Sequence, residues 1–306
     1  MRKGLVTKST GSWFTVADGD ELIKCRIKGK FRIRNIVTTN PVTVGDRVEF
    51  EMLSDGTGMI KKIGERMNYI IRRSTAFHRE AHLLAANIDQ AFIMVCLKEP
   101  ATLREFIDRF LITAEAYHIK SIILLNKTDL LESYDSDRLA EFIQTYKLAG
   151  YECIEMSVKE NRNVSQVYER LKHKINLIAG NSGVGKSSLI NLINPALKLK
   201  TDEISGYHKS GKHTTTFCEM FSLDKDTYVI DSPGIRGFGL IDMEKSEIGL
   251  YFPEIFSISK DCRFYNCTHL HEPDCAVVQA VKEGRIGLSR FESYVSIMTG
   301  DESKYR

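Results

Sequence analysis

The chain has 306 residues, enough for two or three domains, and its 42% hydrophobic and 27% charged residues are those of an ordinary globular protein. The longest uninterrupted apolar run, residues 91–97, is too short to cross a bilayer, and no apolar segment follows the basic N-terminus. These features argue against a membrane span and a secretory signal, and we expect a cytosolic protein.

The formal net charge of +3 is unevenly distributed along the chain. Residues 1–74 contain 15 Lys and Arg but 8 Asp and Glu, a net of +7, which leaves a net of −4 for the remainder. A basic N-terminal region indicates a polyanionic partner such as a nucleic acid.

The first 66 residues have the pattern of a small β-barrel. Five short strand-like segments cover residues 4–9, 13–17, 21–27, 47–52 and 58–63, and turn-forming residues separate them. Because five short strands occur without any helical period, we predict a barrel of the oligonucleotide-binding (OB) type.

Basic residues recur at every second position in one part of this region. They are Lys24, Arg26, Lys28, Lys30, Arg32 and Arg34. In an extended chain they would line one face, provided that no turn at residues 28–30 breaks the alternation. We predict that this face contacts RNA phosphates, although a solvated strand face is the alternative. Three aromatic residues lie nearby in the sequence, Trp13, Phe14 and Phe31. We expect their side chains to pack in the core rather than to contact bases.

Residues 88–235 alternate between strand-like and helix-like segments. Predicted strands cover residues 88–97, 121–125, 152–156, 175–179, 217–223 and 227–230. Predicted helices cover residues 103–117, 137–148 with Ser136 as the cap, 164–173, and a segment that begins at Lys186. This alternation predicts a mostly parallel sheet covered by helices. Beyond Phe238 the pattern becomes helical, apart from an irregular stretch that contains three cysteines.

A phosphate-binding loop of the form G-x-x-x-x-G-K-[ST] follows the apolar strand at residues 175–179. Glycines let backbone N–H groups close around phosphate oxygens, and the following helix adds its dipole. Lys186 can reach the β- and γ-phosphates as a catalytic cation, and Ser187 can hold Mg²⁺. We assign nucleotide binding to Gly180, Asn181, Ser182, Gly183, Val184, Gly185, Lys186, Ser187 and Ser188.

Two other segments have the chemistry of a guanine reader. An N-K-x-D motif follows the strand at 121–125, and an S-A-K-like loop ends the strand at 152–156. These segments consist of Asn126, Lys127, Thr128 and Asp129, and of Ser157, Val158 and Lys159. The Asp129 carboxylate can accept hydrogen bonds from guanine N1–H and the 2-amino group, a donor pair that adenine lacks. Asn126 can tie this loop to the phosphate loop, and the Lys127 stem can lie over the base.

Two further segments have the form of the switches that respond to the γ-phosphate. Asp231, in a D-x-P-G motif, would support Mg²⁺ through water, and the Gly234 N–H would sense the γ-phosphate. Upstream, in residues 211–216, we predict that Thr215 completes the Mg²⁺ shell, with Thr214 as the alternative.

The residue after D-x-P-G is Ile235, where many GTPases have a glutamine that orients the attacking water. An apolar side chain cannot hold a water, so we expect slow hydrolysis unless a partner or another group orients it. His213 is the candidate catalytic residue, because an imidazole can orient or deprotonate water near neutral pH. A structural or RNA contact is the alternative role for His213.

The order of these motifs is itself informative. The guanine reader at residues 126–129 precedes the phosphate loop, whereas ordinary GTPases have the opposite order. We therefore predict a circularly permuted GTPase that transfers the γ-phosphoryl group of GTP to water.

The cysteine-rich stretch has the composition of a metal site. Three cysteines and one histidine, Cys262, Cys267, His269 and Cys275, make a Cys₃His set, which is typical of a closed, structural zinc site. His271 is an alternative ligand. A disulfide is disfavoured in a cytosolic chain with an odd number of cysteines.

Taken together, these motifs resemble the ribosome small subunit-dependent GTPase A (RsgA) family, circularly permuted GTPases of bacteria. The resemblance covers nearly the whole chain. It is also carried by Val-Gly-Asp-Arg at 44–47, Ala-Ala-Asn-Ile-Asp at 85–89 and Cys-Thr-His at 267–269, which Glu272 and Pro273 follow. It favours His269 over His271 as the ligand, and the apolar Ile235 fits the family.

The resemblance implies a three-domain protein with an OB-fold barrel at 1–66, a circularly permuted α/β P-loop GTPase domain at 67–240, and a helical zinc-binding domain at 241–306. It also implies a cytoplasmic, monomeric late assembly factor of the 30S ribosomal subunit that uses GTP/GDP, Mg²⁺ and one structural Zn²⁺. Such a protein would bind 16S rRNA through its barrel and zinc domains, be stimulated by the subunit, and have no membrane partner. The alternatives are a large-subunit assembly GTPase and a non-catalytic, GTP-switched RNA-binding zinc protein.

Overall fold

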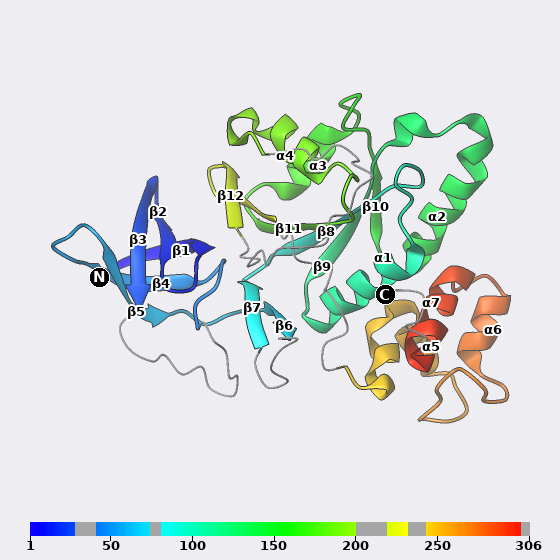
Figure 1. The fold of residues 1–306 in the computed structure, drawn as a ribbon. Helices are drawn as coiled ribbons and strands as arrows, with labels where there is room; N and C mark the ends of the chain where they lie inside the picture. The colour runs from blue at the N-terminus through cyan, green and yellow to red at the C-terminus, as the bar shows by residue number, and fades with distance from the viewer. Residues whose placement is uncertain (28–40, 74–80, 200–218, 232–242, 301–306) are drawn as a thin grey trace, which may run out of the picture. The chain divides into compact units, whose positions relative to one another are not determined.

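The structure is a computed structural model that describes residues 1–27, 41–73, 81–199, 219–231 and 243–300 (Figure 1). Its contacts divide the chain into two compact units. The first unit contains residues 1–91, 166–179 and 186–241, and the second contains residues 92–165, 180–185 and 242–306. No helix in the described part of the chain is long and apolar enough to cross a bilayer.

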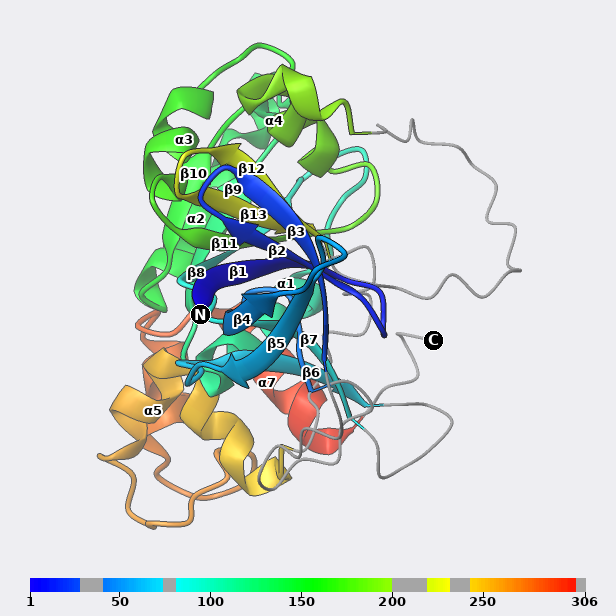
Figure 2. The ribbon, with the colours of Figure 1, turned by 90° about the vertical axis from the view of Figure 1, so that its left-hand side faces the viewer.

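Five strands of the first unit form the predicted barrel, drawn in blue in Figure 2. They are β1 (Arg2–Ser9), β2 (Phe14–Asp18), β3 (Glu21–Ile27), β4 (Arg47–Met52) and β5 (Gly58–Ile63). The strand order is β1-β2-β3-β5-β4, and β4 pairs with β1 to close the barrel. All neighbours are antiparallel except β3 and β5, which run parallel. The predicted OB-like barrel is therefore confirmed.

The barrel core follows the alternation of side chains along each strand. Phe14 and Val16 on β2 and Cys25 on β3 point inward and are almost completely buried. Gly58 belongs to the same packing, because a Cβ atom there would lie 2.4 Å from the sulfur of Cys25. Phe14 thus lies in the core as predicted, but the prediction for Trp13 is wrong, since that side chain is 42% exposed.

A two-stranded hairpin that the sequence did not predict follows the barrel. It consists of β6 (Tyr69–Arg73) and β7 (Ala81–Ala86), which pair antiparallel. The turn before β4 meets the end of this hairpin: Ala86 N donates to Val44 O at 2.9 Å, and a Cβ atom on Gly45 would lie 1.9 Å from the Ala86 carbonyl oxygen. Glycine at position 45, which has a φ of +89°, is therefore required for this close approach.

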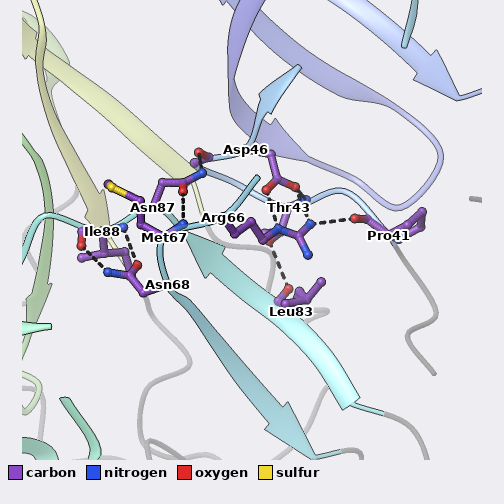
Figure 3. A network of polar contacts seen from close by, with 10 residues as sticks. Pro41, Thr43, Asp46, Arg66, Met67, Asn68, Leu83, Asn87 and Ile88 are labelled. Carbon is purple, nitrogen blue, oxygen red and sulfur yellow. Dashed lines mark hydrogen bonds and ion pairs between the residues drawn. The ribbon is translucent and has the colours of Figure 1, made fainter. Parts of the chain in front are cut away.

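Polar side chains lock the same junction (Figure 3). Arg66 binds both carboxylate oxygens of the fully buried Asp46, at 2.6 and 2.7 Å. Asn87 donates to Gly45 O at 2.9 Å and accepts from Met67 N at 2.9 Å. Asn68 bonds both the N–H and the carbonyl of Ile88 at 2.8 Å. The resemblance segments at 44–47 and 85–89 therefore contact each other, and the linker between the barrel and residue 88 is held by paired polar groups.

The first unit also contains the strand that leads into the phosphate loop. This strand, β11 (Ile175–Ala179), pairs in parallel with β13 (Thr227–Asp231), which pairs antiparallel with β12 (Glu219–Asp224). In turn, β12 meets β1 of the barrel, where Lys8 bonds Glu219 at 2.8 Å. The helix α4 (Lys186–Ile193) follows the phosphate loop at the predicted position.

The second unit contains the strands β10 (Glu152–Glu155), β9 (Lys120–Leu125) and most of β8 (Gln90–Val95), in that order. All six residues of β8 are buried, as expected for a central strand of an α/β sheet. The accompanying helices are α1 (Arg104–Ala116) and α2 (Ser136–Leu148), whereas most of α3 (Val164–Leu171) belongs to the first unit. The predicted cap is wrong: Ser136 is the first helical residue, and Asp135 occupies the cap position without a capping bond from its side chain.

The C-terminal part of the second unit is helical, as predicted. It comprises the 3-10 segment η5 (Lys245–Tyr251) and the helices α5 (Pro253–Ser259), α6 (Ala276–Lys282) and α7 (Leu288–Thr299). Arg290 of α7 is 1% exposed, and it bonds Glu254 of α5 at 2.7 and 3.1 Å and Asp108 of α1 at 2.8 Å. A buried ion network therefore joins the C-terminal helices to α1.

Candidate nucleotide and metal sites

The phosphate loop has the backbone that its glycines predict. Gly180, Gly183 and Gly185 all have positive φ values, of 145°, 79° and 106°. A Cβ atom on Gly180 would lie 2.4 Å from the Met94 carbonyl oxygen, and one on Gly185 would lie 2.4 Å from the side-chain nitrogen of Asn126. Glycine is therefore needed at these two positions both for backbone conformation and for space.

Asn126 connects the guanine-reader segment to the phosphate loop. It follows β9 directly and is 3% exposed. Its side-chain nitrogen donates to Val184 O at 2.8 Å, and its side-chain oxygen accepts from Val158 N at 3.0 Å. One buried amide thus holds three loops of the second unit together, including the two that the sequence assigns to the base.

Asp129 lies on the short 3-10 helix η1 (Thr128–Leu130), which Lys127 opens in a left-handed conformation. One carboxylate oxygen of Asp129 accepts a hydrogen bond from the buried Ser157 hydroxyl at 2.5 Å. The Asp129 carboxylate remains partly exposed. A carboxyl group held from one side suits a ligand that presents two N–H donors, and the Watson–Crick edge of guanine does so.

Residues around the base loop that the sequence did not single out support its shape. Arg162 exchanges backbone hydrogen bonds with Ser157, at 2.8 and 3.2 Å, and closes the loop 157–162. The backbone carbonyl of Glu99 accepts a hydrogen bond from the side chain of the predicted base-binding Lys127. Backbone partners of this kind leave no motif in a sequence, because any residue supplies an N–H and a C=O.

The switch residues are only partly visible in the structure. His213, Thr214, Thr215, Gly234 and Ile235 lie outside the described residues. The backbone of Asp231 ends β13 and pairs with Ile178 of β11, two residues before the phosphate loop begins at Gly180. The chain therefore brings the start of the D-x-P-G motif to the strand that supplies the phosphate loop.

The four predicted zinc ligands converge on one point. Their ligand atoms all lie within 4.8 Å of one another. Cys275 Sγ lies 3.8 Å from the sulfurs of Cys262 and Cys267 and 3.4 Å from His269 Nδ1. Tetrahedral zinc with Zn–S bonds of about 2.3 Å separates two sulfurs by about 3.8 Å. The residues therefore fit a four-coordinate zinc ion, whereas the alternative ligand His271 is exposed and lies outside the cluster.

The electrostatic setting of this cluster also suits a metal. Burial raises the pKa of the Cys267 thiol to about 12 and lowers the pKa of His269, so the uncharged forms prevail without a cation. Zinc would take the place of the thiol protons and leave all four positions filled by protein, which is a structural rather than a catalytic arrangement.

Glu272 organises the backbone of the ligand loop. Its carboxylate accepts from the N–H and hydroxyl of Thr268, both at 2.7 Å, and from the N–H groups of Leu270 and His271, at 3.1 and 3.2 Å. Burial opposes the charge of Glu272, but these donors outweigh it and lower the pKa of Glu272 to about 2. In the sequence, Glu272 was notable only because it matches the RsgA family. In the structure, its hydrogen bonds hold the loop that carries His269.

These features define the class of protein. A P-loop follows β11, a guanine-type N-K-x-D loop precedes it along the chain after β9, and a buried asparagine joins the two. This is a GTPase with circularly permuted motifs.

Comparison with known proteins gives the family. The chain matches the RsgA GTPase family over residues 63–241 and the RsgA N-terminal domain over residues 3–60. It belongs to the RsgA GTPase family.

Relatives and solved structures match the chain along nearly its full length. It is 51% identical to the small ribosomal subunit biogenesis GTPase RsgA of Christiangramia forsetii, with 99% of this chain and 98% of that protein covered. It is 50% identical to the RsgA 2 protein of Bacteroides thetaiotaomicron, with 99% of each covered. Crystal structures of YjeQ from Thermotoga maritima and of YloQ, a circularly permuted GTPase, match with TM-scores of 0.80 and 0.74. Their sequence identities are 35% and 31%, over 98% and 99% of this chain and 98% and 96% of theirs.

Proposed function

We propose that this chain is a late assembly factor of the small ribosomal subunit, a cytoplasmic monomer whose GTP hydrolysis is stimulated by that subunit. The observation that carries the proposal is the near full-length similarity, at 51% and 50% identity, to proteins named for small-subunit biogenesis. The closed OB-like barrel in a region with a net charge of +7 supports a contact with 16S rRNA.

In this proposal the guanine of GTP bonds Asp129 and the backbone of the loop 157–159, and its phosphates lie in the loop 180–188. The position of Asn126 between these loops supports the assignment, since one amide sets the spacing of the base and phosphate sites. Lys186 stabilises the charge of the transferring phosphoryl group, and Ser187 ligates Mg²⁺.

The switch residues act on the γ-phosphate side of the same nucleotide. Thr215 completes the Mg²⁺ shell, Asp231 holds it through water, and Gly234 senses the γ-phosphate. His213 orients the attacking water, a role that the apolar Ile235 cannot take. These assignments rest on motif position in the sequence.

We place the domain boundaries at 1–66, 67–240 and 241–306. The family matches at 3–60 and 63–241 support the first two, and the Cys₃His cluster falls in the remainder. The last domain holds one structural zinc ion and offers a second contact to rRNA.

GTP turnover in the presence of purified 30S subunits, of 50S subunits, and of neither tests this proposal. We expect slow turnover alone, at least a tenfold increase with 30S, and no increase with 50S, with Lys186→Ala as the inactive control. Stimulation by 50S subunits alone would contradict the proposal and indicate a role in large-subunit assembly. Absence of stimulation by either would overturn the proposal and favour a GTP-switched binding protein.

A further inference from the structure

The chain's only tryptophan lies exposed on the barrel. Trp13 is 42% exposed, while its neighbour Phe14 is 2% exposed and lies in the core. Its backbone is fixed, since Trp13 O accepts from Thr10 N at 2.9 Å and from the Thr10 hydroxyl at 3.2 Å. The exposed part of this large aromatic ring is available to a binding partner.

The pairing of β2 with β3 places a cation beside this ring. Phe14 lies opposite Cys25, so Trp13 is next to Arg26 across the two strands. The Arg26 guanidinium lies 5.9 Å from the centre of the tryptophan ring. On the other side, β5 places Met59 opposite Arg26. Trp13, Arg26 and Met59 therefore form a row across the outer surface of three strands.

The same surface has basic groups that are weakly paired. Lys24 is exposed, points outward beside Arg26, and forms no ion pair with any residue in the described ranges. Arg26 lies 4.0 Å from Asp55, with both side chains about half exposed. Lys61 pairs with Glu51 at 2.9 Å, also at the surface. Exposed pairs of this kind contribute about 0–1 kcal/mol, so Arg26 can exchange its carboxylate for a phosphate.

We propose that Trp13 and Arg26 form a stacking platform for an unpaired base of single-stranded RNA, with Lys24 and Arg26 contacting the flanking phosphates. Every base has a face that stacks on an indole, and cations beside the ring supply the phosphate contacts. The proposal rests on the proposed function, because it names the RNA feature that the barrel takes. A protein partner is the weaker alternative, since the ring lies beside the Arg26 guanidinium on an exposed surface.

The single tryptophan makes the proposal directly measurable. Adding short single-stranded oligoadenylate to the full-length protein should quench the Trp13 emission as the base stacks. In parallel, the anisotropy of labelled oligoadenylate should show Trp13→Ala binding about 5- to 150-fold more weakly, while Trp13→Phe retains most of the affinity. Tyr134→Ala, which removes another exposed aromatic side chain, should bind like the parent. Lys24→Ala should lower the slope of log affinity against log salt by about 0.7.

Two outcomes would overturn the stacking platform. One is unchanged emission at oligoadenylate concentrations that saturate the anisotropy. The other is parent-like affinity of Trp13→Ala, with thermal midpoints confirming that the variant is folded. Emission that changes with 30S subunits but is insensitive to competing oligoadenylate would point to a protein contact and also overturn it. Failure of the proposed function is distinguishable, because it appears as loss of 30S-stimulated turnover in the parent chain, whatever oligoadenylate does to the emission.

Discussion

At the scale of single residues, Asn126 links the loops of the proposed nucleotide site. It is buried and uses its amide nitrogen and oxygen on two different loops, through Val184 O and Val158 N. The sequence predicts its link to the phosphate loop, because N-K-x-D asparagines have this geometry. Its second bond, to the backbone of Val158, joins two segments 32 residues apart and has no sequence signal.

Replacing Asn126 with Ala should weaken nucleotide binding and destabilise the fold. The change removes one hydrogen bond to the buried Val184 carbonyl and one from the partly buried Val158 N–H, which together cost about 1–3 kcal/mol. GDP affinity, measured by titration calorimetry, should fall about tenfold or more, since 1.4 kcal/mol corresponds to a factor of ten. Urea unfolding without nucleotide should show the loss of stability. Parent-like GDP affinity would mean that Asn126 does not set the loop spacing.

The choice of histidine in the metal cluster gives a second prediction at this scale. His269 Nδ1 lies 3.6 Å from Cys262 Sγ, and His271 is exposed. His269→Ala should therefore lose zinc, measured by elemental analysis of folded protein, and the C-terminal helices should become less stable. His271→Ala is the matched control and should keep one zinc per chain. Loss of zinc from His271→Ala, with retention in His269→Ala, would reverse the assignment.

At the scale of secondary-structure elements, local patterns predicted most strands and helices. The five barrel strands and β11 lie within two residues of their predicted ends, because side-chain alternation and turn residues are local properties. The hairpin β6–β7 was missed, since Tyr-Ile-Ile-Arg-Arg at 69–73 has no clear alternation. Ser136 was misplaced as a cap because Asp135, the residue before it, is also a capping type.

Local sequence patterns could not predict contacts between residues that are far apart in the chain. Arg290 and Asp108 are 182 residues apart, and nothing local marks either as buried. The same holds for Asn87, which bonds Gly45 across 42 residues. Such groups are buried only because their partners arrive from elsewhere in the chain.

The junction between the turn at 43–46 and the hairpin gives a test of close packing. Gly45→Ala places a Cβ atom against the Ala86 carbonyl, whereas Gly56→Ala, at a similar φ of +78°, meets no atom within 4 Å. Both changes carry backbone strain, but only the first also forces two segments apart. We expect Gly45→Ala to lower the free energy of unfolding by about 1–3 kcal/mol more than Gly56→Ala. Equal losses in urea unfolding would refute this packing.

The buried ion network of the second unit gives the other test at this scale. Arg290→Met removes the cation that pairs with the buried carboxyl groups of Asp108 and Glu254, which should cost about 3–5 kcal/mol. The control is Arg285→Met, which breaks an exposed pair with Glu283 and should cost less than about 1 kcal/mol. Urea unfolding of the zinc-loaded proteins provides the comparison. A similar, small loss in both variants would show that α7 does not depend on the network.

At the scale of the whole molecule, the permuted order puts the predicted nucleotide motifs between the barrel and the Cys₃His region along the chain. The chain enters the GTPase segment from the basic barrel through the Asp46–Arg66 and Asn87 junction. It leaves through the D-x-P-G motif, which begins at Asp231, toward the Cys₃His helices. Our hypothesis is that loss of the γ-phosphate shifts the zinc-binding region relative to the barrel. This shift would change the affinity of the protein for the small subunit.

Nucleotide-dependent binding to the small subunit tests this account most directly. The measurement is co-sedimentation of the full-length protein with purified 30S subunits, in the presence of a non-hydrolysable GTP analogue or of GDP. The account predicts retention with the analogue and at least tenfold weaker binding with GDP. Equal binding in the two nucleotide states would contradict the coupling between hydrolysis and the subunit.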